Sequence, residues 1–175
     1  MTFRRTALAA QMAQQLLRPS FLDTSLRSGL FLSGQRRVGK TTFLATDLIP
    51  ALEALGAIVV YVDLWSQPQA NPADLVHEAI RKTLKELQIP GSGLLKRLKE
   101  VTNLEAGAAG FKFGFKIESV GTEGGATLAE AFTQVVDQAR SDIVLIIDEV
   151  QQTLGTDEGQ ALLHALQALE AAPQR

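Results

Sequence analysis

Residues 30–43 read LFLSGQRRVGKTTF, and this stretch decides the fold. It opens with a short apolar run, Leu30–Ser33, which predicts a buried strand because the run ends at a glycine. Residues 34–41 match the pattern G-x-x-x-x-G-K-[ST]. From Thr41 the apolar residues recur at helical spacing as far as Gly56, which predicts a helix kinked at Pro50. A strand, a glycine-containing turn and a helix in this order are typical of a loop that binds phosphate.

Each fixed position of this loop has a physical role. We expect Gly34 to take a positive φ where the strand turns into the loop, and Gly39 lets the backbone approach phosphate without a Cβ in the way. The loop N–H groups and the start of the following helix favour an anion. Lys40 is expected to bring its charge to the outer phosphates and to act in catalysis, Thr41 to coordinate Mg²⁺, and Thr42 to add its N–H and hydroxyl. The predicted phosphate site consists of Gly34, Gln35, Arg36, Arg37, Val38, Gly39, Lys40, Thr41 and Thr42.

A pair of acidic residues follows a second apolar run. Ile143–Ile147 predicts a strand covered on both faces, and Asp148 and Glu149 come next. Ligands bind at the carboxyl ends of the strands in open parallel sheets. We therefore expect Asp148 to bind Mg²⁺ through its water shell and Glu149 to be the general base that activates water for attack on the γ-phosphate. No Asn-Lys-x-Asp sequence follows Asp148, which favours ATP over GTP.

The remaining elements complete an α/β pattern. Ala57–Leu64 is continuous and β-branched, which predicts another buried parallel strand. Near its end we expect Asp63 at a solvated strand end, and the alternative is that it supports bound Mg²⁺ from behind its ligands. We expect Trp65 to be packed against the protein, and the alternative is that it stacks on adenine. Apolar spacing predicts further helices over residues 72–88, 94–101, 127–140 and 157–171.

Residues 107–118 have a different pattern, because aromatic and charged residues alternate there. The period of two places Phe111, Phe113, Phe115 and Ile117 on one face and Lys112, Lys116 and Glu118 on the other. We interpret this segment as an inserted strand or hairpin whose lysines protect a sheet edge. The alternative is that the aromatic and basic side chains bind single-stranded nucleic acid.

The composition excludes several classes of protein. The 17 basic and 19 acidic side chains give a net charge of −2, unlike proteins that hold nucleic acid through bulk positive charge. The chain has no cysteine, which excludes disulfide scaffolds and thiolate metal sites and suits a reducing compartment, so we expect a cytoplasmic protein. The apolar runs are far shorter than the roughly 18 residues that cross a bilayer, so we expect no contact with a membrane.

Two strings of residues carry a resemblance to a known family, FLSGQRRVGKTTFL over residues 31–44 and IIDEVQ over residues 146–151. They resemble the P-loop ATPases of the AAA+ and STAND type, and most closely the archaeal-type ATPase domain family. The resemblance implies a three-layer α/β fold around a mostly parallel sheet, with ATP and Mg²⁺ bound at Gly34–Thr42. It also implies a metal ligand at Asp148 and a catalytic glutamate at Glu149. Members commonly couple nucleotide state to assembly or to an attached effector or DNA-binding domain.

The chain departs from the family pattern after Glu149. In that group a further strand, which ends in a polar sensor residue, separates the metal-ligand strand from the P-loop strand. Only a helix is predicted after Glu149, so we expect a domain that is incomplete at its C-terminus, without the sensor strand, an arginine finger or a helical lid. This predicts an open slot beside the P-loop strand, and it predicts that residues 1–175 bind nucleotide weakly and hydrolyse it slowly or not at all.

The basic residues gather at the start of the chain, because residues 1–40 carry seven basic side chains and one acidic side chain. We divide the chain into a basic helical segment over residues 1–28 and a P-loop ATPase domain over residues 29–175. Within the first, Leu8, Met12 and Leu16 recur four residues apart and predict an amphipathic helix. Two interpretations stay open for Arg36 and Arg37: contact with phosphate, base or a neighbouring subunit, or a solvated loop tip. The arginines to which the sequence assigns no role are Arg4, Arg5, Arg18 and Arg27.

We predict an ATPase that binds ATP and Mg²⁺ and, in the complete protein, hydrolyses ATP to drive a conformational or assembly switch. The alternative is a nucleotide-gated scaffold that uses ATP to order itself and recruits a partner without significant hydrolysis. A small-molecule kinase is a third interpretation, which the glutamate beside the metal ligand disfavours. Besides ATP, the expected partners are a second copy of the chain, another protein, or nucleic acid bound through a missing C-terminal domain.

Overall fold

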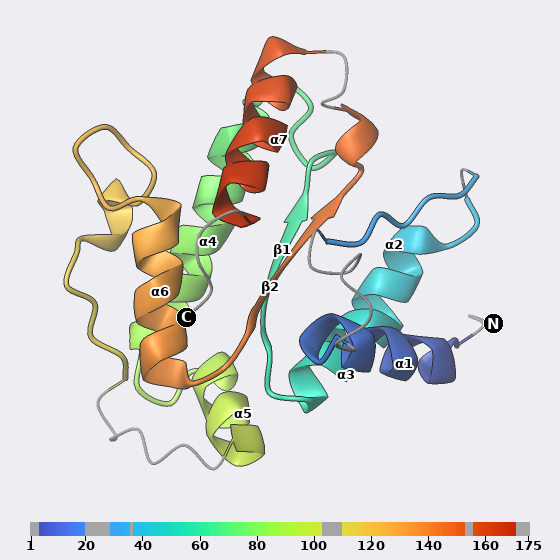
Figure 1. Ribbon diagram of the computed structural model, residues 1–175, viewed down its shortest axis with the longest axis horizontal. Coiled ribbons are helices and arrows are strands. Elements are labelled where there is room, and N and C mark those ends of the chain that lie inside the picture. Colours follow the sequence, from blue (N-terminus) through green and yellow to red (C-terminus); the bar gives the residue numbers. More distant parts are fainter. Residues whose placement is uncertain (1–3, 20–28, 36, 103–109, 153–155, 171–175) are drawn as a thin grey trace.

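The computed structural model describes residues 4–19, 29–35, 37–102, 110–152 and 156–170. Within these ranges, β1 (Ile58–Asp63) and β2 (Ile143–Asp148) form a two-stranded parallel sheet. Helices lie on both sides of this sheet (Figure 1). On one side are α1 (Thr6–Leu17), α2 (Lys40–Phe43) and α3 (Ile49–Ala54), and on the other are α4 (Pro72–Gln88), α5 (Gly93–Thr102), α6 (Leu128–Ala139) and α7 (Asp157–Glu170).

The side chains of the two strands alternate between two hydrophobic cores. The parallel register pairs Ile58 with Ile143 and Asp63 with Asp148. Residues 58, 60 and 62 of β1 pack with residues 143, 145 and 147 of β2 in the large core, whereas Val59, Val144 and Ile146 pack in the small core. Because residues two apart in a strand share a face, residues 61, 63 and 148 belong to the small-core side. The acidic residues at the strand ends therefore face the side on which α2 lies.

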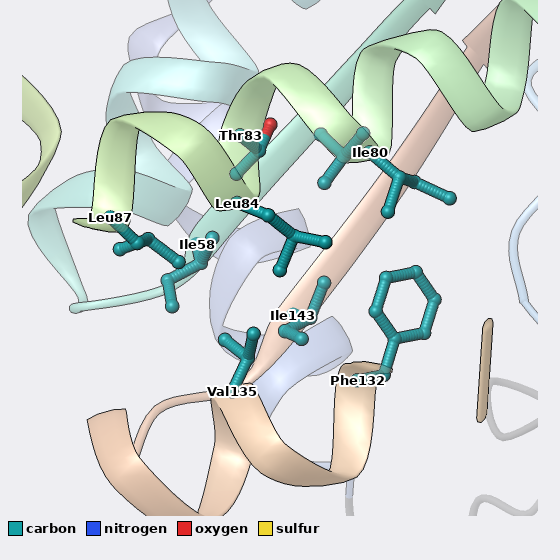
Figure 2. A pocket seen from close by; sticks show the side chains of 9 residues that line it. Ile58, Ile80, Thr83, Leu84, Leu87, Phe132, Val135 and Ile143 are labelled. Carbon is teal, nitrogen blue, oxygen red and sulfur yellow. The ribbon is translucent and has the colours of Figure 1, made fainter. Parts of the chain in front are cut away.

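The large core joins the sheet to α4 and α6. Helix α4 begins at the predicted residue, because the Asn71 side chain accepts a hydrogen bond from the N–H of Ala73 (2.9 Å) and Pro72 occupies the first turn. Figure 2 shows apolar side chains from α4, α6 and both strands turned toward one another around a gap of about 10 Å³. The hydroxyl of Thr83 donates to the carbonyl of Ala79 (3.1 Å). The gap is therefore a small apolar packing defect at the lower limit for holding one water molecule.

The small core joins α1 to the helix that follows the glycine loop. Ala9 and Ala13 are completely buried against a cluster that includes Phe43, Leu48 and Leu52. The predicted N-terminal helix is confirmed. Of the apolar residues that predicted its buried face, Leu8 is 47% exposed, so the buried face is not centred on Leu8. Alanine side chains at the contact let α1 pack closely, since the distance between two helices depends on the side chains between them.

The predicted helix after Thr41 is confirmed, with an irregular turn in place of a simple kink. It consists of α2, a π-helical turn over Leu44–Leu48, and α3. Pro50 lies one residue beyond the start of α3. Since proline has no N–H, it cannot donate to the carbonyl four residues earlier, and the wider π-turn falls directly before it.

The strand predicted over Leu30–Ser33 is wrong. The segment forms no strand, and Leu30, Phe31 and Leu32 are 46%, 80% and 43% exposed. An apolar run becomes a buried strand only where another strand pairs with it and helices cover it. In the part of the chain that the structure describes, the sheet consists of β1 and β2 alone. Residues 30–33 therefore pair with no strand and form an exposed loop.

The inserted strand or hairpin is also wrong over its described part, residues 110–118. The alternation itself is present, because Phe111 and Ile117 are buried while Lys112 and Lys116 are exposed. The backbone hydrogen-bonds to helices rather than to a strand: the Gln138 side chain bridges the N–H and C=O of Lys112. The Gln134 side chain accepts from the N–H of Gly114 (2.9 Å), and the N–H of Phe111 donates to the Leu87 carbonyl (3.0 Å). Residues 107–109 of the predicted strand lie outside the described residues.

The other predicted elements agree with the structure to within about two residues. The strands predicted at 57–64 and 143–147 occur as β1 and β2. The predicted helices 72–88, 94–101, 127–140 and 157–171 occur as α4, α5, α6 and α7. The mixed α/β class with a parallel sheet is therefore confirmed.

Candidate functional site

An open pocket lies at the carboxyl ends of β1 and β2. Its volume is about 260 Å³, and it is lined by Thr41, Asp63, Trp65 and Glu149. These residues come from the helix after the glycine loop, from the end of β1 and the turn after it, and from the end of β2. The parallel register creates this arrangement, because both strands end at the same edge, with Asp63 opposite Asp148.

The loop before α2 is exposed and shaped by two residues in the left-handed region. Gly39 has φ +83°, and Arg37 has φ +64°. The expectation that Gly34 takes a positive φ is wrong, since Gly34 is absent from the left-handed residues and the turn is made nearer to α2. Gly39 takes this conformation without steric cost because it has no Cβ, whereas Arg37, at the exposed tip, takes it at a cost. Arg36 lies outside the described residues.

Lys40 folds back over this loop. Its Nζ donates to the carbonyl of Gly34 (2.9 Å) and to that of Gln35 (3.1 Å). A single cation therefore spans the mouth of the loop. Among the described residues, Lys40 forms no salt bridge: the cations of the three salt bridges there are Arg4, Lys85 and Arg97.

The Asp148 carboxylate, at the end of β2, accepts hydrogen bonds from two donors. Asp148 is buried, with 6% of its surface exposed. The Tyr61 hydroxyl donates to Oδ2 (3.1 Å), and the N–H of Glu149 donates to Oδ1 (2.9 Å). Burial, together with the negative charge of Asp148, raises the pKa of Tyr61 far above its ordinary value. Tyr61 is therefore a permanent hydrogen-bond donor to Asp148.

Glu149 has a strained backbone, because its φ is +58°. For a residue with a Cβ this conformation costs about 1–3 kcal/mol. With this backbone conformation, Glu149 lines the pocket that Thr41 also lines. The side chain of Gln151 donates to Glu149 Oε2. A carboxylate in a strained, held conformation beside an open pocket is typical of a functional position.

Comparison with known proteins shows the family of the chain. Residues 19–175 match the family described as an ATPase domain predominantly from Archaea. The chain belongs to this ATPase domain family. No curated protein and no solved structure matches the chain. The resemblance to an archaeal-type ATPase domain is thus confirmed, and membership suggests nucleotide binding in general terms.

For this ATPase domain, the structure brings some of the predicted site residues together. Thr41 and Glu149 line one pocket, and Asp148 adjoins Glu149. Gly34, Gln35 and Lys40 are joined by hydrogen bonds at the loop mouth. Val38 and Thr42 are exposed on or directly after the loop, and no described contact joins the Thr42 side chain to the pocket. The roles of these residues remain predictions.

Three residues near the site differ from what the sequence favoured or had no assigned part in it. Trp65 was expected to be packed, but it is 50% exposed and lines the pocket; Asp63, expected at a solvated strand end, also lines it. Tyr61 donates a hydrogen bond to Asp148, but nothing in the sequence of β1 alone indicates that it belongs to the site. The signal exists only in the register of β1 against β2, which places residue 61 opposite residue 146 and on the face of residue 148.

Among the described residues, none of the helices is both long enough and apolar enough to cross a lipid bilayer.

Proposed function

We propose that this ATPase domain binds Mg²⁺ and ATP in the pocket between the glycine loop and the strand ends, and hydrolyses the ATP. The observation that carries the proposal is that Thr41, from the loop's helix, and Glu149, from the end of β2, line the same pocket. Thr41, which the sequence assigned to Mg²⁺ and phosphate binding, and Glu149, which it assigned to the activation of water, thus line one pocket. Family membership supports the nucleotide. The proposal includes the three-layer P-loop arrangement of the AAA+ and STAND type.

The chain's own groups fit a phosphate ligand. The loop is exposed, and among the described residues the hydrogen bonds of the Lys40 ammonium go to two carbonyl oxygens, which a phosphate replaces with a stronger, fully charged partner. We assign the phosphate site to Gly34, Gln35, Arg36, Arg37, Val38, Gly39, Lys40, Thr41 and Thr42. Their N–H groups and the helix start stabilise the anion.

The oxygen atoms of the site also fit magnesium. Thr41 and Asp148 offer hydroxyl and carboxylate oxygens, the hard ligands that Mg²⁺ prefers. Mg²⁺ is usually bound through one or two protein oxygens together with phosphates and water. Within the described ranges, no three or more acidic or histidine side chains form a group that could hold a metal ion by themselves. When bound, the ion neutralises charge on the phosphates.

Glu149 is assigned the general-base role. Its carboxylate accepts a proton from a water molecule, whose oxygen attacks the γ-phosphorus. The bond from the γ-phosphorus to the bridging oxygen breaks, and ADP leaves with that electron pair. Tyr61 keeps Asp148 oriented throughout, because it remains protonated.

Two substitutions test the proposal in the whole chain. Lys40→Ala is expected to weaken the binding of Mg·ATP, measured by calorimetry, by at least about tenfold, since a charged hydrogen bond is worth about 1.5–3 kcal/mol. Glu149→Gln is expected to retain ATP affinity and to lower phosphate release at least about a hundredfold. Single-turnover measurements with excess protein detect slow hydrolysis.

Lys82→Ala, on an exposed position of α4, and Glu123→Gln, in an exposed turn, are the matched controls and are expected to behave as wild type. Equal ATP affinity in wild type and Lys40→Ala would contradict the site. ATP binding without phosphate release in wild type would favour the nucleotide-gated scaffold, and transfer of phosphate to an acceptor other than water would favour a kinase.

A further inference from the structure

Two arginines that precede α1 contact the helix that follows the phosphate loop. Arg4 Nε donates to Asp47 Oδ1 (2.5 Å), and Arg4 Nη2 donates to the carbonyl of Thr46 (2.7 Å). The backbone N–H of Arg5 donates to Asp47 Oδ2 (3.1 Å). The Asp47 side chain is only 2% exposed. Both of its oxygens are therefore used by these two arginines, and the start of α1 is fixed to the helix after the loop.

The π-turn explains why this attachment forms at Asp47. Pro50 has no N–H with which to satisfy the carbonyl of Thr46, and Arg4 donates to that carbonyl from outside the helix. The turn at Leu44–Leu48 carries Asp47 into the contact with α1. The hydrogen bond from the Arg5 N–H lowers the pKa of Asp47, burial opposes this, and the ion pair with Arg4 lowers it further. The carboxylate therefore stays ionised at neutral pH.

This attachment brings the Arg5 side chain to the phosphate loop. Arg5 Nη2 donates to the carbonyl of Val38 (3.4 Å). In a trans peptide the C=O and the next N–H point in opposite directions. A donor on the Val38 carbonyl therefore orients the N–H of Gly39 away from Arg5. Gly39 is the residue in the left-handed conformation directly before Lys40, so this one peptide orients the last part of the loop.

We propose that Arg5 is a positioning residue of the nucleotide site: from outside the loop it holds the Val38–Gly39 peptide so that the Gly39 N–H is available to phosphate, and Asp47 holds Arg5. This inference rests on the proposed function. It assigns a role to one of the N-terminal arginines, and it connects α1 to nucleotide affinity through the π-turn.

Arg5→Ala is the sharpest test, because it removes the guanidinium and keeps the backbone N–H that Asp47 accepts. We expect the dissociation constant for Mg·AMP-PNP, measured by calorimetry, to rise about three- to tenfold, the effect of one hydrogen bond. The melting temperature without nucleotide is expected to stay within about 1 °C of wild type. The Gly39 amide resonance is expected to shift in the nucleotide-free protein. Arg18→Ala, an exposed arginine just after α1, is expected to leave all three measurements unchanged.

Arg5→Lys supplies a conservative rescue, because it keeps a cationic donor, and its affinity is expected to lie between those of wild type and Arg5→Ala. The proposal is overturned if Arg5→Ala binds AMP-PNP as tightly as wild type, or if its affinity falls only together with its melting temperature. Absence of AMP-PNP binding to wild type overturns the proposed function itself. Binding to wild type that is lost in Lys40→Ala and unchanged in Arg5→Ala overturns this inference alone.

Discussion

Tyr61 connects the two strands at the residue scale. Its hydroxyl donates to Asp148 from the neighbouring strand, and its raised pKa keeps the proton on the oxygen. A carboxylate that binds a metal needs its second oxygen held by a neighbouring donor, and loss of such a partner typically costs 10–100-fold in metal affinity or activity. On the proposed assignment of Asp148 to Mg²⁺, Tyr61 therefore contributes to the site even though it does not line the pocket.

Tyr61→Phe removes this donor and keeps the ring. We expect the Mg²⁺ concentration that half-saturates ATP binding to rise about tenfold, while the affinity for ATP without Mg²⁺ stays unchanged. Titration of Mg²⁺ at fixed ATP, followed by the fluorescence of Trp65, the single tryptophan, measures this. A half-saturating Mg²⁺ concentration equal to that of wild type would show that Asp148 needs no help from Tyr61.

The sequence predicts those parts of the candidate site whose residues are neighbours along the chain. The glycine loop and the Asp148–Glu149 pair are each contiguous, so their spacing along the chain identifies them. Asp63 and Tyr61 belong to the site through the pairing of β1 with β2, over a separation of 85 residues from Asp63 to Asp148. A single sequence does not contain that register, because each strand alone reads as an ordinary buried run.

At the scale of elements, the predictions succeeded where an element carries its own end signals. Helix α4 has Asn71 and Pro72 at its start and a Pro90-Gly91 turn after it, so both of its predicted ends are confirmed. Two segments lack such signals, Leu30–Ser33 and residues 110–118, and their conformation depends on the elements that pack beside them. The first has no strand partner in the described chain, and the second pairs with glutamine side chains of α6.

The turn between residues 121 and 125 offers a test of packing between elements. Gly121 has φ +76°, and a Cβ there would lie 2.7 Å from the ring of His77 on α4. Gly124 has nearly the same φ, +73°, but open space around it. Gly124→Ala is expected to cost only the left-handed conformation, about 1–2 kcal/mol, and Gly121→Ala is expected to cost more because the His77 ring must also move.

Chemical denaturation of both variants measures the difference. Gly121→Ala combined with His77→Ala is expected to recover most of the additional loss, since the double substitution removes the clash and leaves the backbone cost. Equal free energies of unfolding for Gly121→Ala and Gly124→Ala would show that the turn moves away from α4 freely.

At the scale of the whole molecule, the sheet separates two cores of unequal size. Among the described residues, the large core buries residues from α4, α5, α6 and α7, whereas the helical residues of the small core come from α1, α2, the π-turn and α3. These two sets of helices lie on opposite sides of the sheet (Figure 1). Local opening follows the amount of buried apolar contact. The side of the molecule that carries the phosphate loop is therefore the less stable side.

This asymmetry predicts how nucleotide changes the dynamics of the protein. Without nucleotide, amides of α1 and α3 are expected to exchange with solvent faster than those in the middle of α4, where Val76 and Ile80 are almost fully buried. Ligand stabilises the states that bind it, and the loop is bonded to α1 through Arg5 and Asp47. Mg·AMP-PNP is therefore expected to slow exchange in α1 and α3 more than in α4, as measured by hydrogen exchange and mass spectrometry. Equal slowing in all three helices would mean that the molecule opens as one unit, and slowing confined to the loop would mean that the small core does not respond to its ligand.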